Sequence, residues 1–293
     1  MTAAPRVVAI GGGHGLAATI RAVRGYAACT TAVVATADDG GSTGRLRAGL
    51  PLPAPGDLRR CVAAMAADPE APLARALEYR FGGTDVEGHA LGNLLLAGLA
   101  EATGDFGAAV RELCRLVGLD PARERVVPAT TDPVVLIGET ASGEEVVGQV
   151  AVSNTLGVTG VRVEPADAPA PAEVAEAVAA ADQVVLGPGS LYTSVLAAVT
   201  VDDVREAVKQ SRGPRVYVCN LRAELGETRG YDVAAHVAAL RRHGIEPDVV
   251  LAQRGALPTG DLDCPLVEAD VARPHGLSHD AARLGEALRG LVP

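Results

Sequence analysis

Aromatic side chains are scarce in this 293-residue chain, which contains two Phe, five Tyr and no Trp. The interior must therefore be filled with Val, Leu, Ile and Ala, and few rings remain to stack on bases. Basic residues are also in the minority, since 26 Lys and Arg face 36 Asp and Glu and leave a net charge of −10. Both shortages argue against a protein that binds nucleic acids or anionic membranes through general electrostatics.

Cysteine pairs and long apolar runs are missing as well. The five cysteines are widely spaced and form no Cys-x-x-Cys pair, which argues against a zinc site and a disulfide framework. No apolar run approaches the roughly 18 residues of a membrane-spanning helix, and the N-terminus lacks the features of a signal peptide. We therefore expect a cytoplasmic protein with free thiols and no membrane insertion.

Short apolar segments alternate with helical ones along most of the chain. Strands are expected at residues 6–10, 31–36, 183–186, 215–219 and 248–252, and helices at 16–24, 57–67, 89–102, 106–117, 171–181, 201–210, 231–243 and 279–291. This rhythm predicts an α/β domain spanning 1–293, with a mainly parallel sheet between helical layers. A β-hairpin excursion is expected at about 132–153, with strands at 134–137 and 145–152 flanking Ala-Ser-Gly.

A glycine-rich turn follows the first expected strand. Gly11, Gly12, Gly13, His14 and Gly15 precede a helix, so their backbone amides could point at an anion with the helix dipole behind them. Residues 13–18 also satisfy a loose dinucleotide-binding pattern, G-x-G-x-x-A. A plain strand-to-helix turn explains the same residues, so the signal is weak by itself.

A second glycine-rich loop follows the strand at 31–36. Asp38 and Asp39 are followed by Gly40, Gly41, Ser42, Thr43 and Gly44. Glycine and hydroxyl residues can surround a phosphate, and carboxylates can hold Mg²⁺. A related Gly-Pro-Gly-Ser segment follows the strand at 183–186, which favours a ligand site over a solvated turn.

Four further polar residues are candidates that also have structural explanations. Asp57 opens a helix, where it either caps the helix or contacts a ligand. Arg59 or its neighbour Arg60 could reach a phosphate. His89 and Asn93 are four residues apart and share one helix face, next to glycines that permit close approach.

The ordered set of motifs is more specific than any one of them. It comprises Gly-Gly-Gly-His-Gly at 11–15, Ala-Asp-Asp-Gly-Gly-Ser-Thr-Gly at 37–44, Pro-Gly-Asp-Leu-Arg at 55–59, Tyr-Arg-Phe at 79–81, Gly-His-Ala-Leu-Gly-Asn-Leu-Leu at 88–95, Gly-Pro-Gly-Ser-Leu-Tyr-Thr-Ser at 187–194 and Val-Cys-Asn at 218–220. Over nearly its whole length the chain resembles the YvcK-type gluconeogenesis factor family, also called the UDP-N-acetylglucosamine-binding YvcK family, within the CofD (2-phospho-L-lactate transferase) superfamily.

The resemblance implies a Rossmann-like three-layer αβα fold with a small β-hairpin and extra helices. It also implies a cytoplasmic bacterial protein that binds a UDP-sugar and regulates carbon metabolism, cell shape and peptidoglycan supply, with no established reaction and no required cofactor. The residues that it assigns to ligand binding are Gly11, Gly12, Gly13, His14, Gly15, Asp38, Asp39, Gly40, Gly41, Ser42, Thr43, Gly44, Asp57, Arg59, His89, Asn93, Gly187, Pro188, Gly189, Ser190, Tyr192, Thr193 and Asn220.

The sequence departs from this family in two segments. Many members carry Arg-His-Asp-Thr near the C-terminus, with the Arg associated with nucleotide-sugar binding, and this chain has Ser278-His279-Asp280-Ala281 instead. Arg222-Ala223-Glu224-Leu225 stands where most relatives have Met-Thr-Gln-Pro or similar. A nucleotide phosphate site is still expected, but the sugar and the base are not defined.

Three alternatives to a nucleotide-sugar-binding regulator stay open. The first is a CofD-type phospholactyl transferase, in which Asp38, Asp39 and Asp57 would hold Mg²⁺; Arg59 disfavours it, because an acid is usual there in that branch. The second is a dinucleotide oxidoreductase, and the third a scaffold for a protein partner. Oligomerisation, most simply as a homodimer, is expected from the apolar helices within 89–117.

Overall fold

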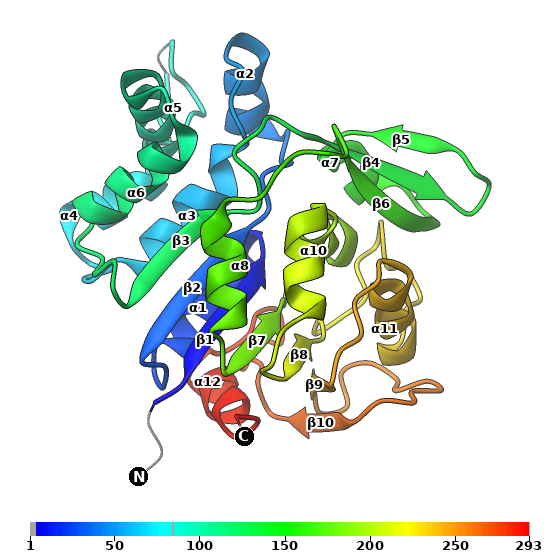
Figure 1. The fold of residues 1–293 in the computed structure, drawn as a ribbon. Helices are drawn as coiled ribbons and strands as arrows, with labels where there is room; N and C mark the ends of the chain where they lie inside the picture. Colours follow the sequence, from blue (N-terminus) through cyan, green and yellow to red (C-terminus); the bar gives the residue numbers. More distant parts are fainter. Residues whose placement is uncertain (1–3, 84, 293) are drawn as a thin grey trace.

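A computed structural model describes residues 4–83 and 85–292 and contains a seven-stranded sheet (Figure 1). Its strands are β1 (Arg6–Gly11), β2 (Cys29–Val34), β3 (Glu124–Pro128), β7 (Gln183–Leu186), β8 (Arg215–Val218), β9 (Val249–Gln253) and β10 (Leu266–Ala269). Their order is β10-β9-β8-β7-β1-β2-β3, and every neighbouring pair is parallel. The predicted parallel sheet is confirmed.

The helices of the described chain cover both faces of this sheet. They are α1 (Gly13–Val23), α2 (Gly41–Gly49), α3 (Pro55–Met65), α4 (Pro72–Glu78), α5 (Leu91–Thr103), α6 (Phe106–Leu116), α7 (Gln149–Asn154), α8 (Ala172–Ala179), α9 (Ala197–Val199), α10 (Asp202–Lys209), α11 (Val233–Arg242), α12 (Ala281–Arg289) and the π-helical turn η1 (Leu191–Leu196). In Figure 1, α8 and α10 lie in front of the sheet and α1 behind it.

Burial on both faces explains why the strands read as continuous apolar runs. Five of the six residues of β1, Arg-Val-Val-Ala-Ile-Gly, are buried, so both faces of this strand pack against protein. Val8 and Ile10 join the core under α8, α10 and α11, whereas Ala9 joins the core under α1, α3 and α6. This packing confirms the predicted three-layer αβα fold.

The predicted hairpin belongs to a small antiparallel sheet. It consists of β4 (Val135–Thr140), β5 (Glu145–Val147) and β6 (Val158–Glu164), in the order β5-β4-β6. The expected second hairpin strand at 145–152 was too long, because residues 149–154 form α7. The Asp39 carboxylate, distant in sequence, accepts a hydrogen bond from the Val150 N–H at 2.9 Å and stabilises the start of that helix.

Some elements were not predicted from the sequence. The glycine-rich segment that follows Asp39 was expected to be a loop, but residues 41–49 form α2. Strands β3, β6 and β10 were also not predicted; β3 and β10 are the two edges of the main sheet. None of the described helices combines the length and the apolar character that crossing a membrane requires.

The strand order places a switch point between β1 and β7. From β1 the chain continues to β2 and β3 on one side, whereas β7 leads to β8, β9 and β10 on the other. In such open parallel sheets, ligands bind outside the carboxyl ends of the strands, where the winding reverses. The loops after β1 and β7 therefore flank the expected crevice.

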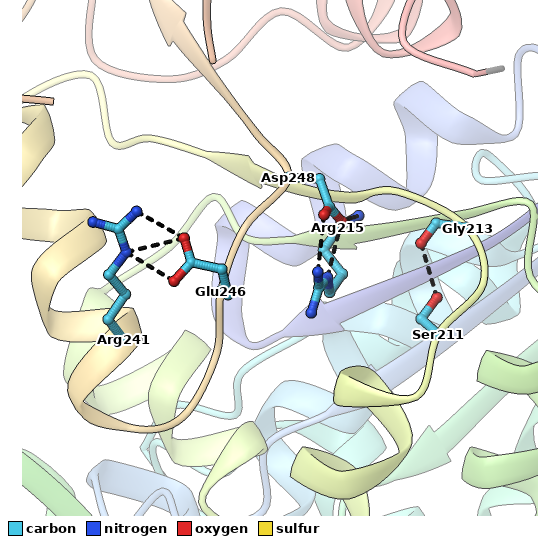
Figure 2. Close-up of polar contacts among 6 residues, drawn as sticks. All are labelled: Ser211, Gly213, Arg215, Arg241, Glu246 and Asp248. Carbon is cyan, nitrogen blue, oxygen red and sulfur yellow. Dashed lines mark hydrogen bonds and ion pairs between the residues drawn. The ribbon is translucent and has the colours of Figure 1, made fainter. Parts of the chain in front are cut away.

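Ion pairs lie at the end of the sheet opposite the crevice, where strands β8 and β9 begin. The Arg215 guanidinium at the start of β8 donates two hydrogen bonds of 2.8 and 2.9 Å to the Asp248 carboxylate before β9, and Arg241 pairs with Glu246 nearby (Figure 2). The Arg215 contact holds the pKa of Asp248 below its usual value. Because Asp248 is 44% exposed, this pair contributes little stability.

We expect Gly15→Ala to destabilise the fold. An added Cβ would lie 2.1 Å from the Pro188 carbonyl oxygen, so the loops after β1 and β7 must separate. The expected loss is about 2–3 kcal/mol of unfolding free energy in denaturant titrations. Gly98→Ala is the matched control, because Gly98 is exposed within α5 and its Cβ would meet nothing within 4 Å. That change should stabilise by about 0.5–1 kcal/mol; equal effects would contradict the prediction.

Candidate functional site

Two glycine-rich loops contact each other at the switch point. Gly13 of the loop after β1 has φ +63° and Gly187 after β7 has φ +78°, a left-handed region that favours glycine. The Thr19 hydroxyl of α1 donates a hydrogen bond of 2.7 Å to the Gly187 carbonyl oxygen. Together with the approach of Gly15 to Pro188, this bond fixes the two loops against one another.

A cavity of about 630 Å³ opens beside these loops. It is lined by His14, Gly15, Ala18, Pro188, Gly189, Asn220, Leu221, Arg222, Ala223, Glu224, Leu225, Leu277, Ser278 and His279. The structure thus gathers residues from the loops after β1, β7 and β8 and from the segment before α12. In the last two segments only Asn220 was predicted to bind a ligand, and both segments contain the departures from the family pattern noted above.

Asn220 connects two of these loops. It follows β8, and its Oδ1 accepts a hydrogen bond of 3.2 Å from the Gly189 N–H. One residue further along the β7 loop, the Ser190 hydroxyl donates a bond of 3.0 Å to the Glu224 carboxylate. The loops that follow β7 and β8 therefore form a single hydrogen-bonded wall of the cavity.

The end of the β7 loop is occupied by a carboxylate of the protein itself. Glu227, which is 2% exposed, accepts hydrogen bonds from the N–H groups of Tyr192 at 2.6 Å and Thr193 at 3.1 Å, and from the Thr193 hydroxyl at 2.8 Å. Burial, with the charge of Glu224 second, raises the pKa of Glu227 to about 8. These donors at the start of η1 are thus already satisfied. Only the location of Glu227 in the loop after Asn220 was evident from the sequence.

Tyr192 is buried beneath this wall. Its side chain is 0% exposed, and its hydroxyl lies 2.9 Å from that of Tyr231. Burial raises the pKa of the Tyr192 hydroxyl well above its usual value. The ring of Tyr192 therefore packs in the core and is not among the cavity-lining residues.

A second group of predicted residues meets at Ser42, at the start of α2. The Ser42 hydroxyl accepts a hydrogen bond of 3.0 Å from the Asn93 amide and lies 3.1 Å from His89 Nδ1. Asn93 is 1% exposed, and its Oδ1 has no hydrogen-bond partner among the residues with described positions. Partial burial, with the charge of Arg45 second, lowers the pKa of His89.

The two aspartates before α2 have different partners. Asp38 Oδ1 accepts a hydrogen bond of 3.0 Å from the Gly40 N–H, a local turn. Asp39 contacts the start of α7, where a Cβ on Gly148 would lie 2.3 Å from Asp39 Oδ2. Within 4–83 and 85–292, no three acidic, His or Cys side chains form a group that could hold a metal ion. Asp38, Asp39 and Asp57 therefore do not form a three-carboxylate group in this part of the chain.

Asp57 lies between the cavity and the Ser42 group. It occupies the first turn of α3, and its carboxylate accepts a hydrogen bond of 2.7 Å from Arg60 and a further one from the backbone of Gly13. A Cβ on Gly12 would lie 2.5 Å from Asp57 Oδ2. Burial raises the pKa of Asp57, and Arg60 opposes that shift. Asp57 in α3 thus holds the backbone of the loop after β1 in place.

Arg59 and His14 differ in their access to a ligand. Arg59 is 1% exposed and forms an ion pair with Glu78, and its side chain crosses Gly92 so closely that a Cβ there would lie 2.5 Å from Arg59 Cγ. His14 is exposed and lines the cavity. Burial lowers the pKa of His14, and Arg60 lowers it further, so His14 is mainly neutral at pH 7.

A model of the family described as "2-phospho-L-lactate transferase CofD" matches residues 7–286. The chain belongs to the CofD family. This CofD-family chain is also 39% identical over 250 residues to the "Gluconeogenesis factor" of Halalkalibacterium halodurans, covering 84% of this chain and 76% of that protein.

Other relatives differ in length from this CofD-family chain. A "Putative gluconeogenesis factor" of Mycobacterium tuberculosis is 42% identical over 97% of this chain and 90% of its own length. The namesake from Deinococcus radiodurans is 45% identical over 84% of this chain but only 53% of its own length. The chain thus spans about half the length of this relative and of a similar one from Nostoc, at 51%.

A solved structure shares the whole fold. The crystal structure of a member of the UPF0052 family from Bacillus halodurans has a TM-score of 0.91 and 32% identity, and the match covers 99% of this chain and 100% of that one. The three-layer architecture described here is therefore that of the family.

We expect Ser42→Ala to lower stability more than an ordinary serine deletion. The change leaves the buried Asn93 amide without its acceptor and removes the contact to His89. A loss of about 1–3 kcal/mol is expected in chemical unfolding. Ser211→Ala is the matched control, because Ser211 donates one bond of 3.0 Å to the Gly213 carbonyl at the opposite edge (Figure 2). A larger loss for Ser211→Ala would contradict the proposed importance of the Ser42 cluster.

Proposed function

We propose that this protein binds a nucleotide sugar of the UDP-N-acetylglucosamine type and acts as a regulator in bacterial carbon metabolism, cell shape and peptidoglycan supply. The observation that carries the proposal is the cavity of about 630 Å³ beside the two glycine-rich loops at the switch point. The names of the relatives as gluconeogenesis factors support the metabolic context.

The chemistry of the lining supports an amphipathic anion. Backbone of the β1 and β7 loops can approach a diphosphate closely, and the α1 N-terminus behind Gly12 has no side-chain cap. Leu221, Leu225 and Leu277 supply apolar surface for a sugar or a base. A volume of this size lies within the usual range for small-ligand sites, about 300–1,000 Å³.

Ser278 stands at the position where the resemblance expects an arginine. It lines the cavity, so the substitution falls at the proposed ligand site rather than at a remote surface. A cavity without that guanidinium has one cation fewer for a phosphate or a sugar. We therefore propose that His14 and the backbone amides hold the diphosphate here.

Cellular context extends the proposal. We propose a cytoplasmic protein that acts as a homodimer and passes the ligand signal to a regulatory protein partner. Light scattering in the presence and absence of ligand tests the dimer. A monomer under both conditions would contradict this part alone.

The transferase alternative is supported by the name of the matching family. It requires a Mg²⁺ site, and Asp39 instead contacts α7 while Arg60 pairs with Asp57. We therefore favour a binding protein over a transferase. Formation of a phospholactyl product from an activated guanosine diester and a deazaflavin alcohol, with Mg²⁺ present, would instead favour the transferase.

Isothermal titration with UDP-N-acetylglucosamine tests the binding function directly. Saturable heat, retained with UDP alone at lower affinity, would support a nucleotide-sugar site. NAD is the competitor that separates a dinucleotide site, since both ligands contain a diphosphate. No heat at millimolar UDP-N-acetylglucosamine would contradict the specific ligand.

We expect Leu225→Asp to weaken the binding of UDP-N-acetylglucosamine about tenfold. Leu225 is 87% exposed at the cavity, so the change should leave the fold intact while adding a negative charge beside an anion. Leu156→Asp is the matched control, because Leu156 is 54% exposed and does not line the cavity. Equal affinities of the two variants in calorimetry would exclude this cavity as the site.

A further inference from the structure

A second cavity, of about 670 Å³, lies at an edge of the main sheet and shares no lining residue with the cavity beside the glycine-rich loops. Strand β3 is the last strand on this side, and α6 packs next to it (Figure 1). Val126 and Val127 both line the cavity, although Val126 belongs to the core under α6 and Val127 to the core under α8. Because neighbouring side chains of a strand point to opposite faces, the cavity extends around the edge of β3.

Most of the cavity wall is apolar. Besides the two valines, it includes the buried side chains of Cys114 in α6 and Leu119 after α6. Burial raises the pKa of the Cys114 thiol to about 12, so this side chain is neutral at pH 7. The volume lies within the usual range for small-ligand sites, about 300–1,000 Å³. The wall therefore suits the apolar body of a small molecule.

The carboxylates of the lining all have a cationic partner. They pair as Glu112 with Arg115 at 2.6 Å, Glu173 with Arg111 at 3.4 Å, and Glu124 with Arg24, which lies outside the cavity, at 2.8 Å. Arg125 is the remaining charged residue of the lining, and among residues 4–83 and 85–292 no carboxylate pairs with it. The cavity therefore carries one positive charge that the protein does not compensate locally.

The Arg125 side chain is held at the cavity by its backbone surroundings. Its Nε donates a hydrogen bond of 2.9 Å to the carbonyl oxygen of Pro121, which also lines the cavity. This bond uses one N–H of the guanidinium, and the two terminal nitrogens are the pair that a carboxylate can engage with two parallel hydrogen bonds. The neighbouring glutamates would oppose a dianionic phosphate more than a singly charged carboxylate.

We propose that this cavity binds a small monocarboxylic acid. The carboxylate of the ligand pairs with the Arg125 guanidinium, and its apolar body lies against Leu119 and Val126. The site shares no residue with the cavity of the proposed nucleotide-sugar function and does not depend on that function.

The edge of β3 is a poor template for a strand from another protein chain. β3 has five residues and ends at Pro128, which has no N–H to donate. Val126 at its centre is 4% exposed, so little of its backbone is open to a partner. A small molecule therefore fits this cavity better than an added strand, whether from a partner protein or from a second copy.

Octanoate is the probe for this site, and octanamide is the matched neutral ligand. At pH 7 octanoate is ionised, so the two molecules differ in charge but hardly in shape. Isothermal titration should show saturable binding of one octanoate. Octanamide should bind about tenfold more weakly, because it cannot form the charge-assisted pair with Arg125.

Arg125→Gln should lower the affinity for octanoate about tenfold and leave that for octanamide unchanged, so the preference for the acid disappears. Arg123→Gln is the matched control. Arg123 is also exposed, and its Nε also donates to a backbone carbonyl, that of Ala28 at 3.2 Å, but it does not line this cavity. This control should behave as wild type with both probes.

A third variant tests the apolar part of the cavity. Ala108 of α6 lines the cavity, so Ala108→Leu adds volume to the wall with a residue that suits a helix. Both probes should bind about tenfold more weakly to this variant. Thermal unfolding verifies that each variant folds, and the Arg125→Gln comparison stands without Ala108→Leu.

Several outcomes would overturn the proposal. They are an absence of heat with millimolar octanoate, equal affinities of the wild type for the two probes, and an unchanged preference for octanoate in Arg125→Gln. Light scattering tests another occupant, because a dimer that dissociates in Arg125→Gln would make this cavity a contact between two copies instead. UDP-N-acetylglucosamine should give the same result with Arg125→Gln as with wild type, so failure at one cavity is distinguishable from failure at the other.

Discussion

The close approach of two backbone segments at the switch point is the constraint on which the rest of the site depends. Gly15 at the start of α1 meets Pro188 after β7 with no room for a side chain. This contact is possible only because β1 and β7 are neighbours in the sheet, although the two strands lie far apart in the sequence, at Arg6–Gly11 and Gln183–Leu186. The cavity and its wall, formed by the loops after β7 and β8 with Asn220 and Glu224, are arranged around this contact.

Helix starts near this edge differ in what satisfies their free N–H groups. Glu227 occupies the start of η1 and Asp39 the start of α7, so each has an internal carboxylate where a ligand anion could have bound. At the start of α1, Gly12 offers no side chain, the Asp57 carboxylate accepts a hydrogen bond from the backbone of Gly13, and His14 and Gly15 line the cavity. Among these three helix starts, that of α1 is the one whose residues line the cavity.

Local sequence patterns predicted the central strands better than the elements that depend on tertiary contacts. The strand at 183–186 was placed correctly because an apolar run bounded by polar residues and glycine is a local signal. Residues 38–44 were expected to be a loop because glycines have low helix propensity, yet α2 begins at Gly41 and continues to Gly49. The start of α7 depends on Asp39, 111 residues away along the chain, a partner that no local pattern predicts.

Residues of the candidate site could be predicted where they belong to a sequence motif. The direction of an individual side chain depends on tertiary packing and could not be predicted. Ser42 was singled out in one motif and the pair of His89 and Asn93 in another, and the fold brings the three into one cluster. Tyr192 gained interest from the scarcity of aromatics, but it is buried. The glycines of the loop after β7 predicted that its backbone would border a ligand site. The direction of the Tyr192 side chain depends instead on tertiary contacts such as that with the Tyr231 hydroxyl.

An acidic, aromatic-poor chain can still offer a site to a nucleotide anion. The net charge of −10 is a sum over the surface, whereas a bound diphosphate responds to the groups within a few ångströms. At this cavity those groups are glycine amides, a mainly neutral His14, the cation Arg222 and the carboxyl group of Glu224. Leu225 and Leu277 provide exposed apolar surface in the place of aromatic rings. Local neutrality, rather than overall basicity, is therefore the physical basis on which this cavity would accept an anion.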